Sequence, residues 1–266
     1  MDQETDVVSA TVWSCGMGVN AAALLVGLVE HGERYDLAMF ADTGTNTGWG
    51  ERSATYAYQP ILNEYAMAHG LPPIMRVWKK LADNSPAPSL YDDCLSRKAL
   101  PSIAYGRKSC SDHYKIRPQR EAVENWQPAI EAWARGERVT WLIGFDAGEW
   151  HRALEYGTDK HVSRYPLVEW GWDRDDCIAA IKRAGLPVPG KSSCFFCPNM
   201  KPREIRDLSE REPEKAALAV RLEQNADITS IKGLGRTFAW VNVIKANQEQ
   251  LRMFPDHQEM PCACIG

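Results

Sequence analysis

Short apolar runs alternate with helical patterns along the first half of the chain, and this alternation constrains the fold more than any other feature. Runs rich in apolar and β-branched residues are typical of strands buried on both faces. Four such runs occupy residues 6–13, 37–41, 74–78 and 139–143, and helical patterns separate them, the last over residues 116–134. Strands that alternate with helices form a mostly parallel sheet. The sequence therefore predicts an α/β fold with a doubly wound, mostly parallel sheet.

Length and composition favour one main globular domain with an appendage. The 266 residues are 44% hydrophobic and 25% charged, and no unbroken apolar run approaches the roughly 18 residues of a membrane span. Beyond Pro198 the sequence becomes charged and helical, so we expect a main domain over residues 1–198 and a helical appendage over residues 199–266. The acidic start, MDQETD, lacks the features of a secretory signal, which predicts a cytoplasmic protein.

A small-residue turn follows the first predicted strand and leads into an apolar helix. It contains Ser14, Gly16 and Gly18, and Asn20 precedes the apolar helical pattern. Backbone N–H groups of a glycine turn at a helix N-terminus can face a phosphate, and the helix dipole adds to the attraction. The turn matches neither the Walker A pattern nor G-x-G-x-x-G, and a plain tight connection is the alternative. We predict an anion-binding loop here.

A second turn, Asp42-Thr43-Gly44, directly follows the strand predicted at residues 37–41. In a parallel sheet, ligands bind at the carboxyl ends of the strands near a switch point. This turn and the turn after Trp13 are therefore expected to lie side by side and to contribute to one site. Taken alone, Asp-Thr-Gly is equally typical of an ordinary turn with a helix cap.

The eight cysteines point to metal or redox chemistry, because thiols of a cytoplasmic protein stay reduced. Cys194 and Cys197 are spaced so that two thiolates can reach one metal ion or cluster from a single turn. A redox dithiol is the alternative, but a thioredoxin-type pair should begin a helix directly after a strand. We predict metal ligation by this pair. Cys15 and Cys177 are interpreted as packing residues.

Several segments, in this order along the chain, resemble the PAPS reductase-like family of the PP-loop, or adenine nucleotide α-hydrolase, superfamily. They are S-C-G-M-G-V-N, F-A-D-T-G-T-N, S-C-S-D-H-Y-K-I-R-P, W-L-I-G-F-D-A-G-E-W-H-R and K-S-S-C-F-F-C-P. The family includes sulfonucleotide reductases, phage-type proteins and sulfur-transfer enzymes such as the sulfur-handling component of DNA phosphorothioation. The resemblance implies an adenine nucleotide α-hydrolase-like fold that binds ATP or a PAPS-like nucleotide.

The resemblance also implies which residues form the site. Those expected to bind the nucleotide are Ser14, Gly16, Met17, Gly18, Val19, Asn20, Asp42, Thr43, Gly44, Gly144 and Arg152. Those expected to hold the metal are Cys110, Cys194 and Cys197, with Cys262 of the tail as the first choice for a fourth ligand and Cys264 or Cys94 as alternatives. The resemblance favours a [4Fe-4S] cluster, with zinc as the alternative. The family usually has a serine where this chain has Ala21. One hydroxyl donor of the family's loop is therefore missing, which argues against rapid ATP cleavage.

Three functions follow from the resemblance. The leading hypothesis is an adenine-nucleotide-dependent sulfur-transfer or nucleic-acid-modifying enzyme, in which ATP activates an acceptor oxygen as its adenylate and the cluster delivers or positions sulfur. Its partners would be a nucleic-acid substrate and a protein that donates sulfur or electrons. The second is reduction of PAPS or adenylylsulfate, in which Arg152 pairs with the phosphate or sulfate and a tail thiol, Cys262 or Cys264, attacks sulfur. The third is a non-catalytic nucleotide-binding protein.

Overall fold

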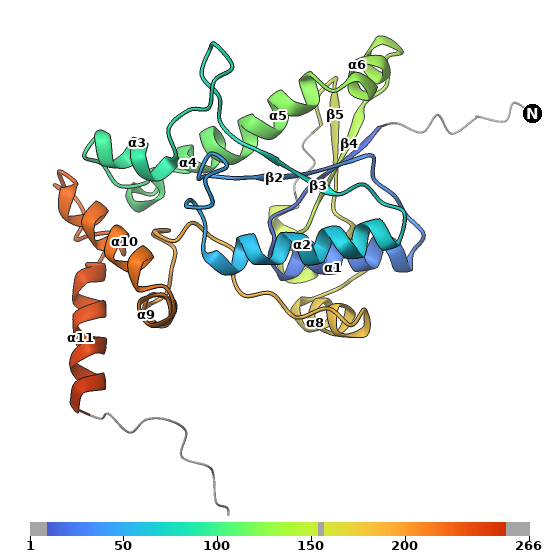
Figure 1. Cartoon of the computed structure of the whole chain (residues 1–266). Helices are drawn as coiled ribbons and strands as arrows, with labels where there is room; N and C mark the ends of the chain where they lie inside the picture. The colour runs from blue at the N-terminus through green and yellow to red at the C-terminus, as the bar shows by residue number, and fades with distance from the viewer. Residues whose placement is uncertain (1–9, 154–156, 254–266) are drawn as a thin grey trace, which may run out of the picture. The chain divides into compact units, whose positions relative to one another are not determined.

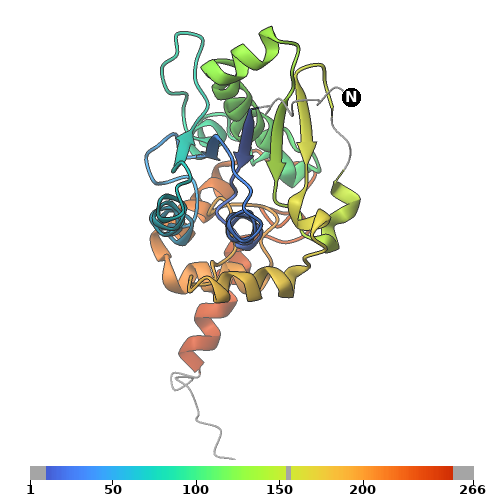
Figure 2. The ribbon, with the colours of Figure 1, turned by 90° about the vertical axis from the view of Figure 1, so that its right-hand side faces the viewer.

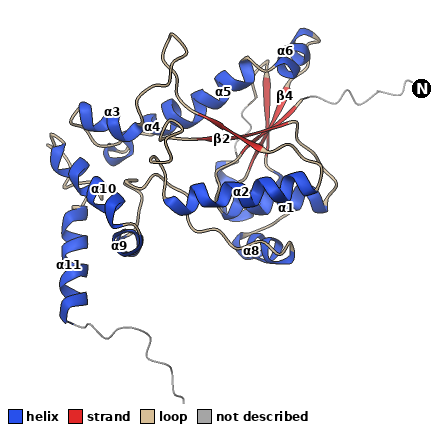
Figure 3. Ribbon diagram, in the orientation of Figure 1, coloured by secondary structure: helices blue, strands red, loops and turns tan. Residues whose placement is uncertain are grey.

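The computed structural model describes residues 10–153 and 157–253. It contains a five-stranded sheet in which every paired strand is parallel, in the order β3-β2-β1-β4-β5 (Figure 1, Figure 3). The strands are β1 (Thr11–Ser14), β2 (Leu37–Ala41), β3 (Ile74–Val77), β4 (Val139–Ile143) and β5 (His161–Arg164). The predicted doubly wound parallel sheet is confirmed. Strand β5 was not predicted, because its His-Val-Ser-Arg sequence has no apolar run.

The order of the strands shows where the chain changes the side of β1 on which it adds strands. From β1 the chain adds β2 and then β3 on one side, and it returns to the other side of β1 for β4 and β5. The turns after β1 and β2 are neighbours, as predicted, because these strands pair. The topological switch point, however, lies between β1 and β4, and ligands of open α/β sheets bind at such a point. The turn after β4 therefore joins the turn after β1 at the crevice.

Helices cover both faces of the sheet (Figure 1, Figure 2). One face packs against α1 (Val19–Glu30) and α2 (Ser53–Ala68), with α8 (Arg174–Arg183) packed against α1. The other face packs against α5 (Arg117–Glu124) and α6 (Gln127–Ala134). Adjacent strand residues serve opposite faces, as the alternation of a strand requires: Trp13 belongs to the first core and Val12 to the second. The single helix expected over residues 116–134 is two helices, because Pro128 lies in the first turn of α6.

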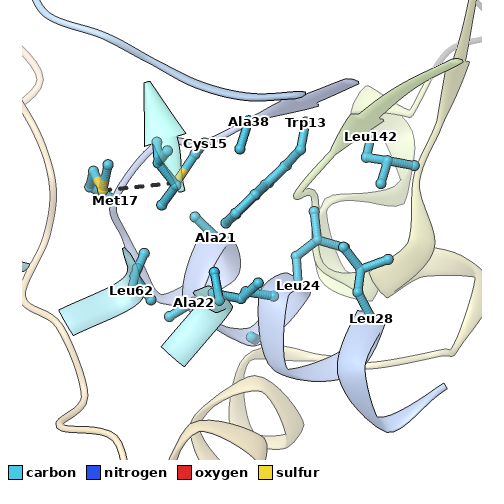
Figure 4. Close-up of a cluster of buried hydrophobic side chains, with 14 of the residues drawn as sticks. Trp13, Cys15, Met17, Ala21, Ala22, Leu24, Leu28, Ala38, Leu62 and Leu142 are labelled. Atoms are coloured by element: carbon cyan, nitrogen blue, oxygen red, sulfur yellow. Dashed lines mark hydrogen bonds between the residues drawn. The ribbon is translucent and has the colours of Figure 1, made fainter. Parts of the chain in front are cut away.

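Helix α1 is buried along most of its length. All residues from Ala21 to Leu28 are buried, which is expected of a helix that is apolar on every side. Figure 4 shows Ala21, Leu24 and Leu28 of this helix against Trp13 and Leu142 of the strands. The burial fixes the position of the α1 N-terminus at the end of β1.

The described chain divides into two compact units. The first comprises residues 10–90, 110–153 and 157–194 and contains the sheet; the second comprises residues 91–109 and 195–253. The second unit is helical, with most of α3 (Leu90–Ser96), α9 (Pro202–Arg211), α10 (Pro213–Asn225) and α11 (Trp240–Met253). Short elements complete the fold: a 3₁₀ turn Ser102–Tyr105, α4 (Ser109–Ser111), a π-helical turn Asp112–Ile116, a 3₁₀ turn Ala147–Arg152 and α7 (Pro166–Glu169). No helix within the described residues combines the length and the apolar character that crossing a membrane requires.

Candidate functional site

The loop after β1 points its side chains inward and leaves its backbone open. Cys15 and Met17 are 3% and 1% exposed, whereas Gly16 between them is exposed. Apart from its two chain neighbours, no described residue has an atom within 4 Å of a Cβ added at Gly16. Met17 has a φ of 56°, in the left-handed region, and this lets the loop reverse its direction into α1. Space for a ligand is therefore available directly over the Gly16 backbone.

The start of α1 has no side-chain cap among the residues that the structure describes. Gly18 is the N-cap residue, no described side chain makes a capping hydrogen bond to the helix, and no acidic residue lies in its first turn. The first N–H groups of a helix have no partner inside the helix. Ser192 crosses close to this turn, since a Cβ added at Gly18 would lie 3.1 Å from its Oγ. The α1 N-terminus thus retains the positive partial charge that favours an anion.

Asn20 ties the start of α1 to the turn after β4. Its Nδ2 donates to a carboxylate oxygen of Asp146 and to one of Glu149, both at 3.1 Å. Its Oδ1 accepts from Arg174 Nη1 at 2.9 Å. Gly144 allows this close approach, because an added Cβ would lie 3.3 Å from the Asn20 carbonyl oxygen. Two turns at the switch point are therefore held together by one amide side chain.

Arg152 lies on the same β4 turn, and protein groups engage it. It forms an ion pair with Glu149, and its guanidinium lies 4.3 Å from the centre of the Phe145 ring. Its side chain is 49% exposed, so it can change partners at little cost. Arg152 is linked to the start of α1 through Glu149, which accepts a hydrogen bond from Asn20. Arg174 is linked to it directly, because it donates to Asn20. Arg174 was not among the predicted site residues, because nothing in the local sequence distinguishes it from any other arginine in the first turn of a helix.

The turn after β2 is organised around a buried carboxylate. Asp42 accepts hydrogen bonds from Gly44 N–H at 2.8 Å, Asn46 N–H at 3.1 Å and the Tyr56 hydroxyl at 2.6 Å. Burial, followed by this bond to Asp42, raises the pKa of Tyr56, so the phenol stays protonated and donates. Asp42, Thr43 and Gly44 are all buried. The Asp42 carboxylate therefore holds the turn together from inside.

Next to this turn the structure gathers a second polar cluster that the sequence did not predict. Glu51 is fully buried, and its Oε1 accepts from the Thr43 hydroxyl at 3.1 Å and lies 3.1 Å from Lys115 Nζ. The Cys194 thiol donates to the same oxygen at 3.6 Å and lies 3.3 Å from the Thr43 hydroxyl. We call Thr43, Glu51, Lys115 and Cys194 the Glu51 cluster. It combines a carboxylate, an ammonium, a hydroxyl and a thiol, and no spacing of residues in the sequence predicts it.

The cysteines predicted to bind metal have different surroundings. Cys194 is buried in the first unit within the Glu51 cluster, and Cys110 is half-buried in that unit. Cys197, also half-buried, belongs to the second unit, as does the buried Cys94. Cys262 and Cys264 lie outside the described residues. Within residues 10–153 and 157–253, no three histidine, cysteine, aspartate or glutamate side chains converge as a metal site requires.

The cysteines interpreted as packing residues are buried in the core. Cys15 is 3% exposed and Cys177 is fully buried. Burial raises the pKa of each thiol to about 12. Both therefore remain protonated at neutral pH and are inert as nucleophiles or ligands.

A cavity of about 790 Å³ lies elsewhere in the first unit, along the outer edge of the sheet. Its lining comes from β3 and the turn after it, including Met75, Trp78 and Leu81, and from α5 with the residue that follows it. It shares no residue with the loop after β1 or with the turn after β4. The candidate site is therefore an open backbone loop at the switch point rather than this cavity.

Comparison with known proteins gives similarities of fold. No protein-family model and no curated protein matches the sequence. The chain is similar to a crystal structure of phosphoadenylyl-sulfate (PAPS) reductase from Candida auris in a phosphate complex, with 15% identity and a TM-score of 0.43 over 69% of this chain and 76% of that one. It is also similar to the U34-tRNA thiolase NcsA from Methanococcus maripaludis with its [4Fe-4S] cluster, with 14% identity and a TM-score of 0.39 over 98% of this chain and 78% of that one.

Proposed function

We propose that this chain binds the phosphate end of an adenine nucleotide at residues 14–20 and uses the nucleotide to transfer sulfur to a nucleic-acid acceptor. The loop observation carries the proposal. In the part of the chain that the structure describes, the Gly16 backbone faces open space and the helix behind it begins without a side-chain cap. Free N–H groups at a helix N-terminus, placed at a topological switch point, form a binding site for a phosphate group.

The other predicted nucleotide-binding residues have different parts in this proposal. Ser14, Gly18 and Asn20 are half-buried and border the open loop, whereas Met17 and Val19 are buried and fix its shape. Gly144 lets the β4 turn approach, and Arg152 and Arg174 supply positive charge beside the phosphates. An arginine fork suits a phosphate because it donates two parallel hydrogen bonds. Asp42, Thr43 and Gly44 shape the neighbouring turn.

The proposed chemistry has two steps. An acceptor oxygen forms a bond to the α-phosphorus of ATP, and pyrophosphate leaves with the electrons of the broken P–O bond. A sulfur nucleophile from a donor then forms a bond to the acceptor, and AMP departs with the oxygen. The chain binds and orients the nucleotide in both steps, and the positive groups around residues 14–20 stabilise the charge that develops on the phosphates.

The metal centre is a separate part of the proposal. A [4Fe-4S] cluster or a zinc ion would take thiolates from Cys194, Cys197 and Cys110, with Cys262 as the fourth ligand. Cys194 is a candidate for this role because its sulfur lies beside two polar groups, the Thr43 hydroxyl and the Glu51 carboxylate. The described residues do not assemble the complete ligand set. We therefore assign the metal no step, and iron, sulfide and zinc analysis of protein purified without oxygen tests it independently.

The variant Gly16→Val tests nucleotide binding at the loop. The new side chain would enter the space over the loop, which holds no protein atom within 4 Å of the added Cβ. The fold should tolerate the change, with a stability loss within about 0.5 kcal/mol. ATP affinity, measured by isothermal titration calorimetry, should fall by about tenfold or more. Gly190→Val is the matched control, because Gly190 is also open and has no left-handed φ.

Product analysis then separates the possible reactions. Release of AMP and pyrophosphate from ATP in the presence of acceptor supports adenylation, whereas release of sulfite from PAPS would support reduction instead. Equal ATP affinity in the wild-type protein and Gly16→Val would refute nucleotide binding at this loop. ATP binding without any turnover would leave a non-catalytic nucleotide-binding protein.

A further inference from the structure

A tightly built loop in the second unit, residues 232–237, is not explained by the proposed nucleotide site. Its anchor is Glu223, a carboxylate only 5% exposed. Glu223 accepts hydrogen bonds from the N–H groups of Leu234 at 2.7 Å, Trp240 at 2.8 Å and Val241 at 3.1 Å. One buried charge thus fixes both the loop and the first turn of α11. A buried carboxylate that binds three N–H groups is well compensated.

Two glycines let the loop close over this anchor. A Cβ added at Gly233 would overlap the Glu223 carboxylate, and one added at Gly235 would overlap the Phe238 ring. The N–H of Arg236 donates to the Gly233 carbonyl at 2.9 Å, and the N–H of Lys232 donates to the Arg236 carbonyl at 2.7 Å. The backbone of this loop is therefore fully determined by its neighbours.

Arg236 occupies the most constrained position in the loop. Its φ is 64°, in the left-handed region that L-residues other than glycine, asparagine and aspartate rarely adopt. Glycine would fit this backbone without strain, yet the chain has arginine. Backbone strain of this kind persists where the surrounding structure enforces it, and it is common at binding sites. The guanidinium is therefore the feature to explain.

That guanidinium has few acceptors within the described residues. It carries five N–H donors, and its recorded hydrogen bond goes from Nη2 to Asn199 Oδ1 at 3.3 Å, a long bond to a neutral group. Its buried Nε has no acceptor there. By contrast, Arg164 of the first unit lies between the carboxylates of Glu33 and Glu169. Arg236 thus keeps its charge and most of its donors for a group that residues 10–153 and 157–253 do not supply.

The surroundings of Arg236 favour an anion. Asn199 is two residues beyond Cys197, so the loop lies beside the segment that follows the C-x-x-C pair. Lys232 is exposed at the start of the loop. Residues 91–109 and 195–249 contain 13 lysines and arginines against 10 aspartates and glutamates, a net charge of +3, whereas the whole chain carries −4. Charge asymmetry of this kind attracts anionic ligands to one part of a molecule.

We propose that Arg236, assisted by Lys232, forms a second oxyanion site that binds a phosphate group. The site lies in the second unit and is independent of the nucleotide proposed at residues 14–20. Arginine suits phosphate because its planar fork matches two phosphate oxygens. The phosphate belongs either to the backbone of a nucleic-acid strand or to a small phosphate ester, and the two sources are distinguished by experiment.

The decisive variant is Arg236→Gly. Glycine prefers the backbone conformation at this position, so the melting temperature should not fall, whereas the guanidinium is lost. The control is Arg211→Gln, which removes the same charge from α9 in the same unit, where the side chain is 78% exposed and pairs with Asp207. The first probe is a labelled single-stranded oligonucleotide, followed by fluorescence anisotropy. The second is pyrophosphate, titrated by calorimetry in the Gly16→Val background so that the first loop does not contribute.

We expect Arg236→Gly to weaken binding of at least one probe by about tenfold, while Arg211→Gln binds like the parent protein. If the oligonucleotide is the ligand, the slope of log affinity against log salt should fall by about 0.7, the value for one lost phosphate contact on a single strand. Weakened oligonucleotide binding alone identifies a nucleic-acid backbone, and weakened pyrophosphate binding alone identifies a small phosphate ester. The proposal is refuted if Arg236→Gly binds both probes like the parent, or if the parent binds neither.

Discussion

Lys115→Met should destabilise the first unit far more than Glu51→Gln, although both remove the same ion pair. The Glu51 side chain is 1% exposed and the Lys115 side chain 39%, with 3.1 Å between Oε1 and Nζ. Removing the ammonium leaves a carboxylate that cannot reach water, whereas removing the carboxylate leaves an ammonium that can. Removing Lys115 should therefore lower the free energy of unfolding more than removing the charge of Glu51.

The magnitudes follow from this difference in burial. Breaking a buried ion pair so that one charge stays buried costs about 3 kcal/mol or more. Glu51→Gln keeps an oxygen acceptor for the Thr43 hydroxyl and lets Lys115 rehydrate, so its cost should be nearer 1 kcal/mol. The double variant should be about 2 kcal/mol more stable than the sum of the two single losses predicts, because glutamine removes the charge that makes Lys115→Met costly.

Urea unfolding followed by tryptophan fluorescence and circular dichroism measures these differences, with the two units analysed as separate transitions if the probes do not coincide. Arg117→Met is the control. Arg117 is two positions after Lys115 in the sequence, and it forms an exposed ion pair with Asp112 at 2.8 Å. Its loss should cost about 0.5 kcal/mol or less. An equal or larger cost for Glu51→Gln than for Lys115→Met, or additive effects in the double variant, would refute the reasoning.

Three further predictions concern the core and the loop. Gly27→Ala should destabilise the protein by about 1 to 3 kcal/mol in urea unfolding, because the added methyl would overlap the Trp170 ring, although alanine is the better helix former; a gain in stability would contradict the packing of α1. Burial raises the pKa of Cys15 from 9.0 to about 12, so its neutral thiol favours the folded state up to pH 9, and this contribution is lost as the pH rises toward 12. At pH 11 the wild-type protein should have lost about 3 kcal/mol of this stability. The difference in unfolding free energy between the wild type and Cys15→Ala should therefore decrease by that amount between pH 9 and pH 11. A difference that stays constant would contradict the raised pKa of Cys15. Asn20→Asp replaces the amide that donates to two carboxylates with a third carboxylate. It should lower the free energy of unfolding, measured by thermal unfolding, by about 2 kcal/mol, and it should weaken ATP binding. An unchanged ATP affinity would show that the turn after β4 does not contribute to nucleotide binding.

Cysteine chemistry shows how far reasoning from the sequence extends. Cys15, in the loop after the first predicted strand, and Cys177, on a predicted helix, were interpreted as packing residues, and both are buried. The C-x-x-C spacing of Cys194 and Cys197 predicts a shared metal, yet Cys194 lies in a buried polar cluster of the first unit while Cys197 belongs to the second. Local spacing indicates what two thiols can do, but the path of the chain decides what surrounds them.

The sequence alone predicts the parallel sheet and the position of the loop after β1, because hydrophobic runs, helical periods and glycine turns act over a few residues. It gave the bounds of β2 and β4 as the structure has them. The folded chain was needed to show that β4 returns beside β1, that Asn20 joins the two turns there, and that Glu51, Lys115 and Cys194 meet. These contacts link residues between 64 and 143 positions apart or depend on a crossover between strands. They form only when the buried faces of α1 and the sheet pack together, because no local pattern encodes a partner so far away.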